Sequence, residues 1–264
     1  MNPQNNMLRI AAAQIAVTDN LSRNLETILN AIRREAARQI DIVLFPETAL
    51  SGYSVKLGHP RPPEEWPPIQ AALQAVAAAA REYGLWVVVG CDAWNDGAWT
   101  NRMYAFSDAG EQVAHYDKVH LTRDDTHFYR QGKRDVVFDL NGICVGLQVC
   151  YDVRFPEGYR ALLDQGARVV LQGFNAASGG TWKLPVLAAH LRSRAAENGF
   201  YVVAANAAGP LQMVVSQIID PDGLILAQAN QDCEEIIEAE LNLEHVSQLD
   251  IRGDYQYKYR YPLG

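Results

Sequence analysis

The chain has 264 residues, enough for one large α/β domain, and 48% of them are hydrophobic, which argues against disorder. The formal net charge of -8, without any run of Lys and Arg, argues against a nucleic-acid partner, because affinity for phosphate backbones depends on clustered cations. The four cysteines form no CxxC pair, and no signal peptide or bilayer-length apolar run is present, so we expect free thiols, a cytoplasmic protein and no membrane partner.

The first half of the chain alternates buried strands with helices. Thr18-Asp19-Asn20 is a cluster of helix N-cap residues, and apolar residues recur after it at helical spacing. The run Ile40–Phe45, which ends at Pro46, is rich in β-branched residues and does not alternate with polar ones, which is typical of a strand buried on both faces. The strands expected here are Leu8–Val17, Ile40–Phe45 and Leu85–Gly90, and Pro67–Tyr83 is an expected helix that ends at Gly84.

The second half adds hairpins to this alternation. One is predicted between Met103–Phe106 and Val113–Tyr116, and another around Asn141-Gly142, between Val136–Leu140 and Ile143–Val149. Further strands are expected at Ala167–Gln172, Phe200–Ala205, Met213–Ile219, Leu224–Ala229 and Glu235–Ala239, and helices at Pro156–Gln165 and Trp182–Asn198. This mixture favours a four-layer α-β-β-α sandwich of two mixed sheets over a single parallel sheet. We expect one domain over residues 1–264, with a Tyr-rich tail from about 245 to 264 that packs on a partner subunit.

Cys150 is the candidate nucleophile. It follows the strand Ile143–Val149 directly, and Pro156 can begin a helix a few residues later. A thiol at such a strand–turn–helix junction is exposed at the sheet edge, where backbone N–H groups can receive a developing oxyanion. The alternative is an inert core cysteine, since free Cys is among the most buried residue types.

A thiol also needs activation, because it is mostly protonated at neutral pH. Glu47 comes directly after a buried strand and Pro46, so its carboxylate is a candidate base, although it could also be a solvated loop residue. Lys118 follows the strand Val113–Tyr116, and an ammonium there could stabilise a thiolate and tetrahedral intermediates. Composition alone would make Lys118 an ordinary surface lysine.

Three segments together resemble the signature blocks of the nitrilase superfamily, in that family's order. They are Phe45-Pro46-Glu47, Tyr116-Asp117-Lys118-Val119-His120-Leu121 and Cys150-Tyr151-Asp152-Val153-Arg154-Phe155-Pro156-Glu157. The resemblance extends to Ala13-Gln14, to Gly52-Tyr53, and to Arg194-Ala195-Ala196-Glu197-Asn198 with Asn206. It thus spans roughly Ile10 to Asn206.

The resemblance implies a nitrilase-like α-β-β-α fold, homodimers or larger homo-oligomers, and no metal or organic cofactor. It also implies a catalytic set of Glu47, Lys118 and Cys150, with the backbone N–H of Tyr151 in the oxyanion site. Such a set hydrolyses a non-peptide carbon–nitrogen bond in a small amide through a cysteine thioester, and releases ammonia or an amine. The motif Cys150-Tyr151-Asp152 resembles the motifs of amidases and carbamoyl hydrolases more than that of true nitrilases, whose Cys-Trp-Glu motif is absent.

One departure concerns a second glutamate that many relatives carry after the lysine. The stretch Thr122–Phe128 has no Glu, and Asp125, or less favourably Asp124, could replace it with a shorter reach. Tyr53, Asn175 and Trp182 are further candidates for substrate-binding or supporting residues on neighbouring loops, although each could equally serve packing or capping.

Several alternatives stay open at this point. The substrate could instead be an N-carbamoyl amino acid or a nitrile, and a non-catalytic scaffold or binding protein is conceivable because the second glutamate is missing. His115, His120, Asp124, Asp125 and His127 have side chains that suit a metal ion, but their spacing matches no compact metal motif. If Cys150 is the nucleophile, we expect it to have a low pKa and to react faster than the other three cysteines.

Overall fold

Two six-stranded sheets pack face to face in the computed structural model, which describes residues 6–176, 181–210 and 212–245. The expected C-terminal tail from 246 onward lies outside the described residues. The first sheet has the order β12-β1-β2-β3-β4-β5, and the second has the order β11-β10-β9-β8-β7-β6. The strands of the first sheet are β1 (Met7–Gln14), β2 (Ile42–Leu44), β3 (Trp86–Asn95), β4 (Ala98–Phe106), β5 (Gln112–Asp117) and β12 (Glu235–Asn242). Those of the second are β6 (Val136–Leu140), β7 (Ile143–Val149), β8 (Val169–Phe174), β9 (Tyr201–Asn206), β10 (Gln217–Ile219) and β11 (Ile225–Gln228).

Each sheet is mixed. β1, β2 and β3 pair in parallel, while β12, β4 and β5 add antiparallel partners on either side. In the second sheet β7, β8 and β9 are parallel and β6 and β10 are antiparallel to their neighbours. The hairpin predicted around Asn141-Gly142 is confirmed with both strand boundaries as expected.

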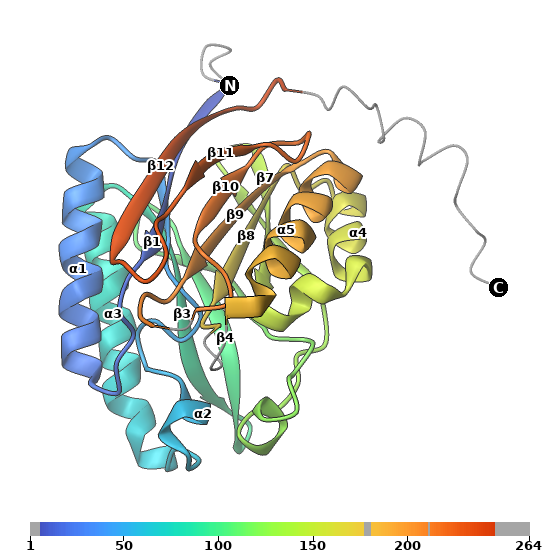
Figure 1. Cartoon of the computed structure of the whole chain (residues 1–264). Helices are drawn as coiled ribbons and strands as arrows, with labels where there is room; N and C mark the ends of the chain where they lie inside the picture. Colours follow the sequence, from blue (N-terminus) through green and yellow to red (C-terminus); the bar gives the residue numbers. More distant parts are fainter. Residues whose placement is uncertain (1–5, 177–180, 211, 246–264) are drawn as a thin grey trace.

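Helices cover the outer face of both sheets, which gives the four layers (Figure 1). The helices α1 (Leu21–Ala37) and α3 (Trp66–Tyr83) lie on the first sheet, and α4 (Pro156–Asp164) and α5 (Leu184–Asn198) lie on the second. The predicted N-cap and the predicted end at Gly84 are confirmed, because the side chain of Asn20 accepts a hydrogen bond from the N–H of Arg23 and Gly84 ends α3 in left-handed conformation. Gly199 ends α5 in the same way. The predicted four-layer α-β-β-α fold is therefore confirmed.

The hydrophobic core has three parts that correspond to the three interfaces between layers. One cluster lies between the helices α1 and α3 and the first sheet, one between the two sheets, and one between the second sheet and the helices α4 and α5. β8 and β9 carry apolar residues to both sides and are buried throughout. Strands buried on both faces explain why these segments lack the polar alternation of surface strands.

The prediction missed one hairpin. β3 continues past Gly90 to Asn95 and turns at Asp96-Gly97 into β4, which begins at Ala98. Both turn residues have positive φ, as an Asp-Gly hairpin requires. Asp92 interrupts the apolar run but is fully buried, because its carboxylate pairs with Arg61 at 2.8 Å. The short helix α2 (Ser54–Leu57) was also not expected.

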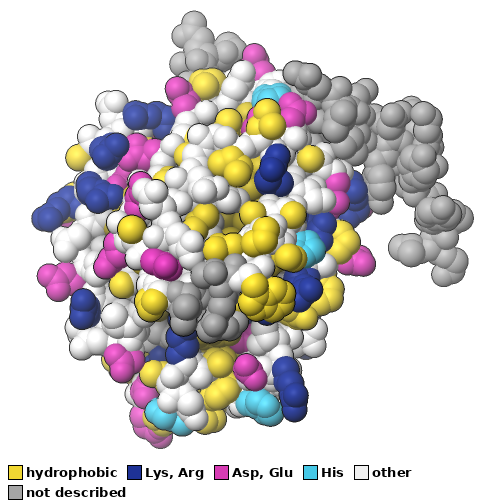
Figure 2. Space-filling model, in the orientation of Figure 1, with side chains coloured by type: hydrophobic (Ala, Val, Ile, Leu, Met, Phe, Trp, Pro, Cys, Tyr) yellow, Lys and Arg dark blue, Asp and Glu magenta, His cyan; other side chains and the backbone are white. Residues whose placement is uncertain are grey.

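Charged side chains of both signs are scattered over the face shown in Figure 2, and hydrophobic side chains gather near α5 and β11. The exposed large hydrophobic residues of η4 (Thr181–Lys183), α5 and β11 with its preceding loop are Trp182, Val186, Leu224, Ile225 and Leu226. Within the described ranges, no helix combines the length and apolar character that a membrane span needs.

Candidate active site

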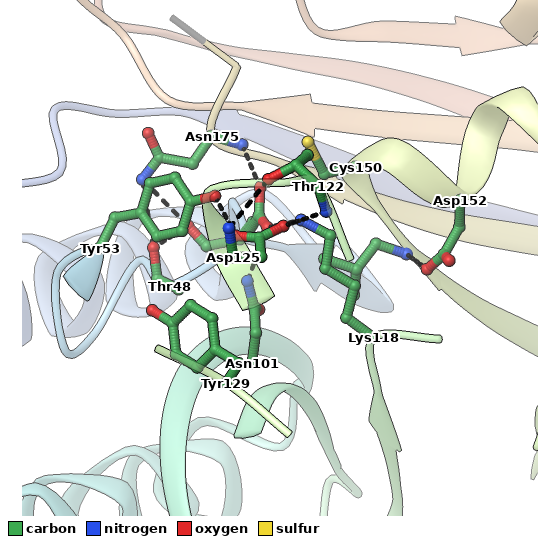
Figure 3. Close-up of polar contacts among 12 residues, drawn as sticks. Thr48, Tyr53, Asn101, Lys118, Thr122, Asp125, Tyr129, Cys150, Asp152 and Asn175 are labelled. Atoms are coloured by element: carbon green, nitrogen blue, oxygen red, sulfur yellow. Dashed lines mark hydrogen bonds and ion pairs between the residues drawn. The ribbon is translucent and has the colours of Figure 1, made fainter. Parts of the chain in front are cut away.

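Three loops bring the predicted set together. Glu47 follows β2, Lys118 follows β5, and Cys150 is the first residue after β7. Lys118 donates from Nζ to Oε1 of Glu47 at 2.8 Å, and both side chains lie close enough to Cys150 to shift the pKa of its thiol. The residues come from both sheets, and they meet with their polar neighbours in one cluster (Figure 3).

Glu47 is fully buried, and both of its carboxylate oxygens have donors. Oε1 accepts from Nδ2 of Asn101 at 2.7 Å as well as from Lys118, and Oε2 accepts from the backbone N–H of Asn175 at 2.8 Å. A buried carboxylate without such partners would be strongly unfavourable. Gly90 allows the loop to come this close, because a Cβ there would lie 2.3 Å from the oxygen of Pro46 and 2.4 Å from the nitrogen of Thr48.

Lys118 is the opposite of a surface lysine, with its side chain fully buried between two carboxylates. Nζ also donates to Oδ2 of Asp125 at 2.8 Å. Burial alone would lower the pKa of Lys118, but the charges of Glu47 and Asp125 outweigh it and raise the pKa above its ordinary value. The ammonium is therefore permanently charged at the centre of the cluster.

Asp125 lies where the second carboxylate of the cluster was expected. Its Oδ2 accepts from Lys118 and from the N–H of Thr122 at 2.9 Å, and its Oδ1 accepts from the hydroxyl of Tyr53. Burial alone would raise the pKa of Asp125, but Lys118 and the two other donors lower it below its ordinary value. Asp124, the other candidate, is exposed.

Cys150 occupies a backbone conformation that is unusual for a residue with a side chain, with φ at +46°. It follows β7 directly, as the sequence predicted, and begins the 3-10 helix η3 (Cys150–Arg154), which was not expected. Non-glycine residues in this region are strained and persist where the surrounding structure holds them. The N–H of Tyr151 lies in the first turn of η3, where N–H groups have no intrahelical acceptor and can serve a ligand.

Asp152 fixes this turn. Its Oδ2 accepts from the N–H of Val149 at 3.1 Å and from the hydroxyl of Tyr116 at 2.9 Å, and its Oδ1 accepts from the N–H of His120 at 2.8 Å. Tyr116 and His120 flank Lys118 by two residues on either side. One buried carboxylate thus ties the segment that carries the lysine to the turn that carries the cysteine.

The expectation of a low pKa at Cys150 is wrong. Burial and the neighbouring carboxylate of Glu47 raise the pKa of the thiol well above its ordinary value, and the ammonium of Lys118 offsets only part of this. The sulfur is therefore protonated at rest, and Glu47 is positioned to accept its proton.

Two of the three remaining predicted residues join the cluster. Tyr53 binds Asp125 through its hydroxyl, and Asn175 binds Glu47 through its backbone N–H and Thr48 through Nδ2 at 3.1 Å. Trp182 is not among them, because 70% of it is exposed and its ring instead meets Nζ of Lys183 at 5.1 Å from the ring centroid.

Two residues of the cluster were missed by the sequence analysis. Asn101 belongs to β4 and binds Glu47. The sequence pattern that could have identified it is a polar residue shortly after the Asp96-Gly97 turn, which was not recognised as a hairpin. Lys56 belongs to α2 and donates from Nζ to Oδ1 of Asn175 at 2.6 Å. No local pattern in the sequence distinguishes Lys56 from a surface lysine.

The five residues considered for a metal do not gather at one point. Asp125 binds Lys118, and Nδ1 of His120 lies 2.8 Å from Asp152. Among the described residues, only Asp220, Asp222 and His245 bring three potential ligand atoms within 4.8 Å of one another. Arg194 and Glu197, which lie one helical turn apart on α5, form an ion pair at 2.9 Å.

Comparisons with known proteins agree on one family. A sequence profile described as carbon-nitrogen hydrolase matches residues 9–250. An (R)-stereoselective amidase from Pseudomonas sp is 31% identical over 95% of this chain and 90% of its own length, and a 2-oxoglutaramate amidase from Bacillus subtilis (strain 168) is 31% identical over 88% and 93%. The structure of a mutant of the Nesterenkonia AN1 amidase, from the nitrilase superfamily, is similar with a TM-score of 0.79 and 25% identity, and covers 94% of this chain and 93% of that one.

Proposed function

The chain belongs to the carbon-nitrogen hydrolase family, the nitrilase superfamily, and we propose that it hydrolyses small amides through a thioester on Cys150, releasing ammonia or an amine. The observation that carries the proposal is the junction of Glu47, Lys118 and Cys150 in one buried cluster. A thiol, a base and a fixed cation are the groups that acyl transfer from an amide requires.

In the first step, Glu47 takes the thiol proton as the sulfur of Cys150 attacks the amide carbon. The raised pKa of the thiol makes this base necessary, because hardly any free thiolate exists beforehand. The negative charge that develops on the substrate oxygen is stabilised by Nζ of Lys118 and by the N–H of Tyr151. Glu47 then gives the proton to the departing amine, and the thioester remains on Cys150.

The second step hydrolyses the thioester. A carboxylate must remove a proton from the attacking water, and Glu47 is free to do so once the amine has left. Asp125 supports the step by helping Glu47 to hold Lys118, since both carboxylates accept from the same Nζ at 2.8 Å. This contact supports the proposal that Asp125 takes the role expected of the second family glutamate.

Amides are favoured over the other bonds that this superfamily cleaves. The relatives at 31% identity are named as amidases, and the Cys-Trp-Glu motif of true nitrilases is absent from the sequence. N-carbamoyl amino acids are the second candidate substrate class, because the sequence motif around Cys150 resembles those of both amidases and carbamoyl hydrolases. Nitriles are expected to be poor substrates.

The test is a panel of small amides, N-carbamoyl amino acids and nitriles, with ammonia release as the readout. We expect turnover of amides by the native enzyme and none by Cys150→Ala, with Cys233→Ala as the control because that cysteine is exposed. Mass spectrometry of acid-quenched protein should detect an acyl group on Cys150. Nitrile turnover with inert amides, or full activity of Cys150→Ala, would overturn the proposal.

We also propose that residues 1–264 form a single hydrolase domain, and that it assembles as a homodimer or a larger homo-oligomer in the cytoplasm. The exposed apolar side chains of α5 and β11 support self-association, since large apolar patches commonly mark interaction surfaces. Light scattering coupled to size exclusion tests the assembly, and a monomer at micromolar concentration would contradict it.

A further inference from the structure

Lys56 presents a positive charge beside the active-site cluster without a carboxylate of its own. It lies in the short helix α2, three residues after Tyr53. Its Nζ donates to the neutral amide oxygen of Asn175 at 2.6 Å, and within the described part of the chain no carboxylate lies within 4.0 Å of it. A charge held in place by a neutral partner is available for an anion.

The ammonium lies at the border between solvent and the cluster. Although the residue as a whole is exposed, burial lowers the pKa of Lys56, and the charge of Glu47 counters this only in part. The group is thus partly stripped of water and still reachable from solvent. A bound anion would replace the missing water and raise the pKa of Lys56 again.

Asn175 sets the position of this charge relative to the reacting groups. Its backbone N–H binds Glu47 and its Nδ2 binds Thr48, while its side-chain oxygen points away from the sulfur of Cys150 (Figure 3). Because Lys56 binds that oxygen, the ammonium lies beyond Asn175 as seen from the sulfur. A ligand that reaches both Cys150 and Lys56 needs a few atoms between its two ends.

We propose that Lys56 binds a carboxylate at the far end of the substrate, so that the preferred substrates are amides that carry a carboxylate a few carbons from the amide carbon. The inference rests on the proposed function and adds the substrate class to it. A single ammonium suits a monoanionic carboxylate, whereas a phosphate group is usually bound by several donors or an arginine fork. Nδ2 of Asn175 cannot donate to a larger anion, because it already donates to Oγ1 of Thr48 and to the backbone oxygen of Glu47.

Three amides of matched length test the charge preference. Succinamate, butyramide and 3-aminopropanamide have the same chain and differ in a terminal carboxylate, methyl or ammonium group. We expect the native enzyme to prefer succinamate in kcat/KM, and 3-aminopropanamide to be the poorest. Lys56→Met, which keeps the aliphatic stem, should lower the succinamate-to-butyramide ratio about tenfold or more, mainly through KM. Lys56→Arg should retain most of the ratio.

Lys133→Met is the matched control, because Lys133 is exposed and lines a different pocket, together with Arg102 and Asp117. It should leave the ratio unchanged. If Lys56→Met lowers the turnover of all three amides by the same factor, Lys56 only positions Asn175 and the inference is wrong.

A direct binding measurement separates this inference from the proposed function. Calorimetry with Cys150→Ala should detect succinamate binding that Lys56→Met weakens about tenfold or more, whether or not the native enzyme turns the compound over. Absence of ammonia from all three amides with Lys56-dependent binding would count against the proposed hydrolysis alone. Binding that does not change with Lys56→Met would count against the carboxylate site alone.

Discussion

The protonated thiol of Cys150 follows from the way in which the site is buried. Glu47 has donors on both carboxylate oxygens, so its charge is well stabilised and it raises the pKa of the neighbouring sulfur. Lys118 cannot reverse this, because its single charge is shared between Glu47 and Asp125. The arrangement differs from a thiolate–imidazolium pair, in which the nucleophile is already ionised.

The first prediction concerns this protonation state. Ultraviolet absorbance of the thiolate, taken as the difference between native protein and Cys150→Ala, should show no thiolate signal at neutral pH. Glu47→Gln removes one of the charges that raise the pKa, so the difference signal should appear at lower pH in that variant. A thiolate signal in the native protein at neutral pH would contradict the proton-transfer step assigned to Glu47.

The second prediction concerns the carboxylate that replaces the family glutamate. Asp125→Asn removes one of the two charges on Lys118 and should lower kcat about 10²-fold, the range typical of a positioned acid–base partner. Asp124→Asn is the matched control, since that neighbour is exposed and should change activity less than about twofold. If both variants are equally active, Asp125 has no part in the reaction.

The sequence predicts the cysteine and the glutamate of this site better than the lysine. Cys150 and Glu47 follow recognisable strands, so their position at a sheet edge is visible from hydrophobic patterning. The burial of Lys118 depends on Glu47 and Asp125, whose approach no local pattern reveals. Only the resemblance of the surrounding segment to family blocks identified it.

At the scale of elements, the site depends on how closely loops can approach strands. The loop after β2 lies against β3 at Gly90, whose N–H donates to the oxygen of Pro46 at 3.2 Å. The same loop meets β8 at Gly173, where a Cβ would lie 3.1 Å from the nitrogen of Glu47. Two glycines from different sheets therefore leave the space that Glu47 occupies.

The third prediction tests this packing. Gly90→Ala places a methyl group against backbone atoms that no side-chain rotation can move, and should reduce the free energy of unfolding by about 1–3 kcal/mol while lowering activity. Gly158→Ala in α4 is the control, because its nearest neighbour is a side-chain oxygen at 3.2 Å. Chemical denaturation and amide turnover measure the two effects. Unchanged stability of Gly90→Ala would show that the loop can relax.

The ends of strands were predictable where a turn sequence such as Asn-Gly was recognised. They were not predictable where a strand contains buried polar residues. The Asn141-Gly142 hairpin agrees at both ends, whereas β3 was expected to end at Gly90 and continues past Asp92 to Asn95. Asp92 is satisfied by Arg61, Ser54 and Tyr129, which lie 31, 38 and 37 positions away from it in the sequence. Partners of this kind cannot be assigned before the fold is known.

At the scale of the whole molecule, the fold class was predictable and the order of strands was not. Alternating buried strands and hairpins indicate two mixed sheets with outer helices. The pairing of β1 with β12 joins residues more than 200 positions apart, and the site draws Glu47 and Lys118 from one sheet and Cys150 from the other. Such long-range choices depend on the packing of all three core clusters at once.

The fourth prediction follows from the number of buried acids that the fold holds in their protonated form. Burial raises the pKa of Tyr53, Tyr116, Tyr129, Tyr159 and Cys91. When the pKa of a group is higher in the folded than in the unfolded protein, its contribution to stability is complete below the unfolded pKa. That contribution is lost as the pH rises from the unfolded pKa through the folded pKa. Lys118 acts in the same direction, since its raised pKa means that the folded protein holds its proton longer.

The free energy of unfolding should therefore fall steeply above about pH 10, where unfolded tyrosines ionise, by up to about 1.4 kcal/mol per pH unit for each such group. Denaturant unfolding at a series of alkaline pH values measures the slope. Tyr104→Phe removes one phenol whose pKa burial raises and should make the slope shallower, while Tyr83→Phe, at an exposed position, is the control. A stability that stays constant through this range would mean that the phenols ionise within the folded protein, and that its interior admits water far more readily than its packing indicates.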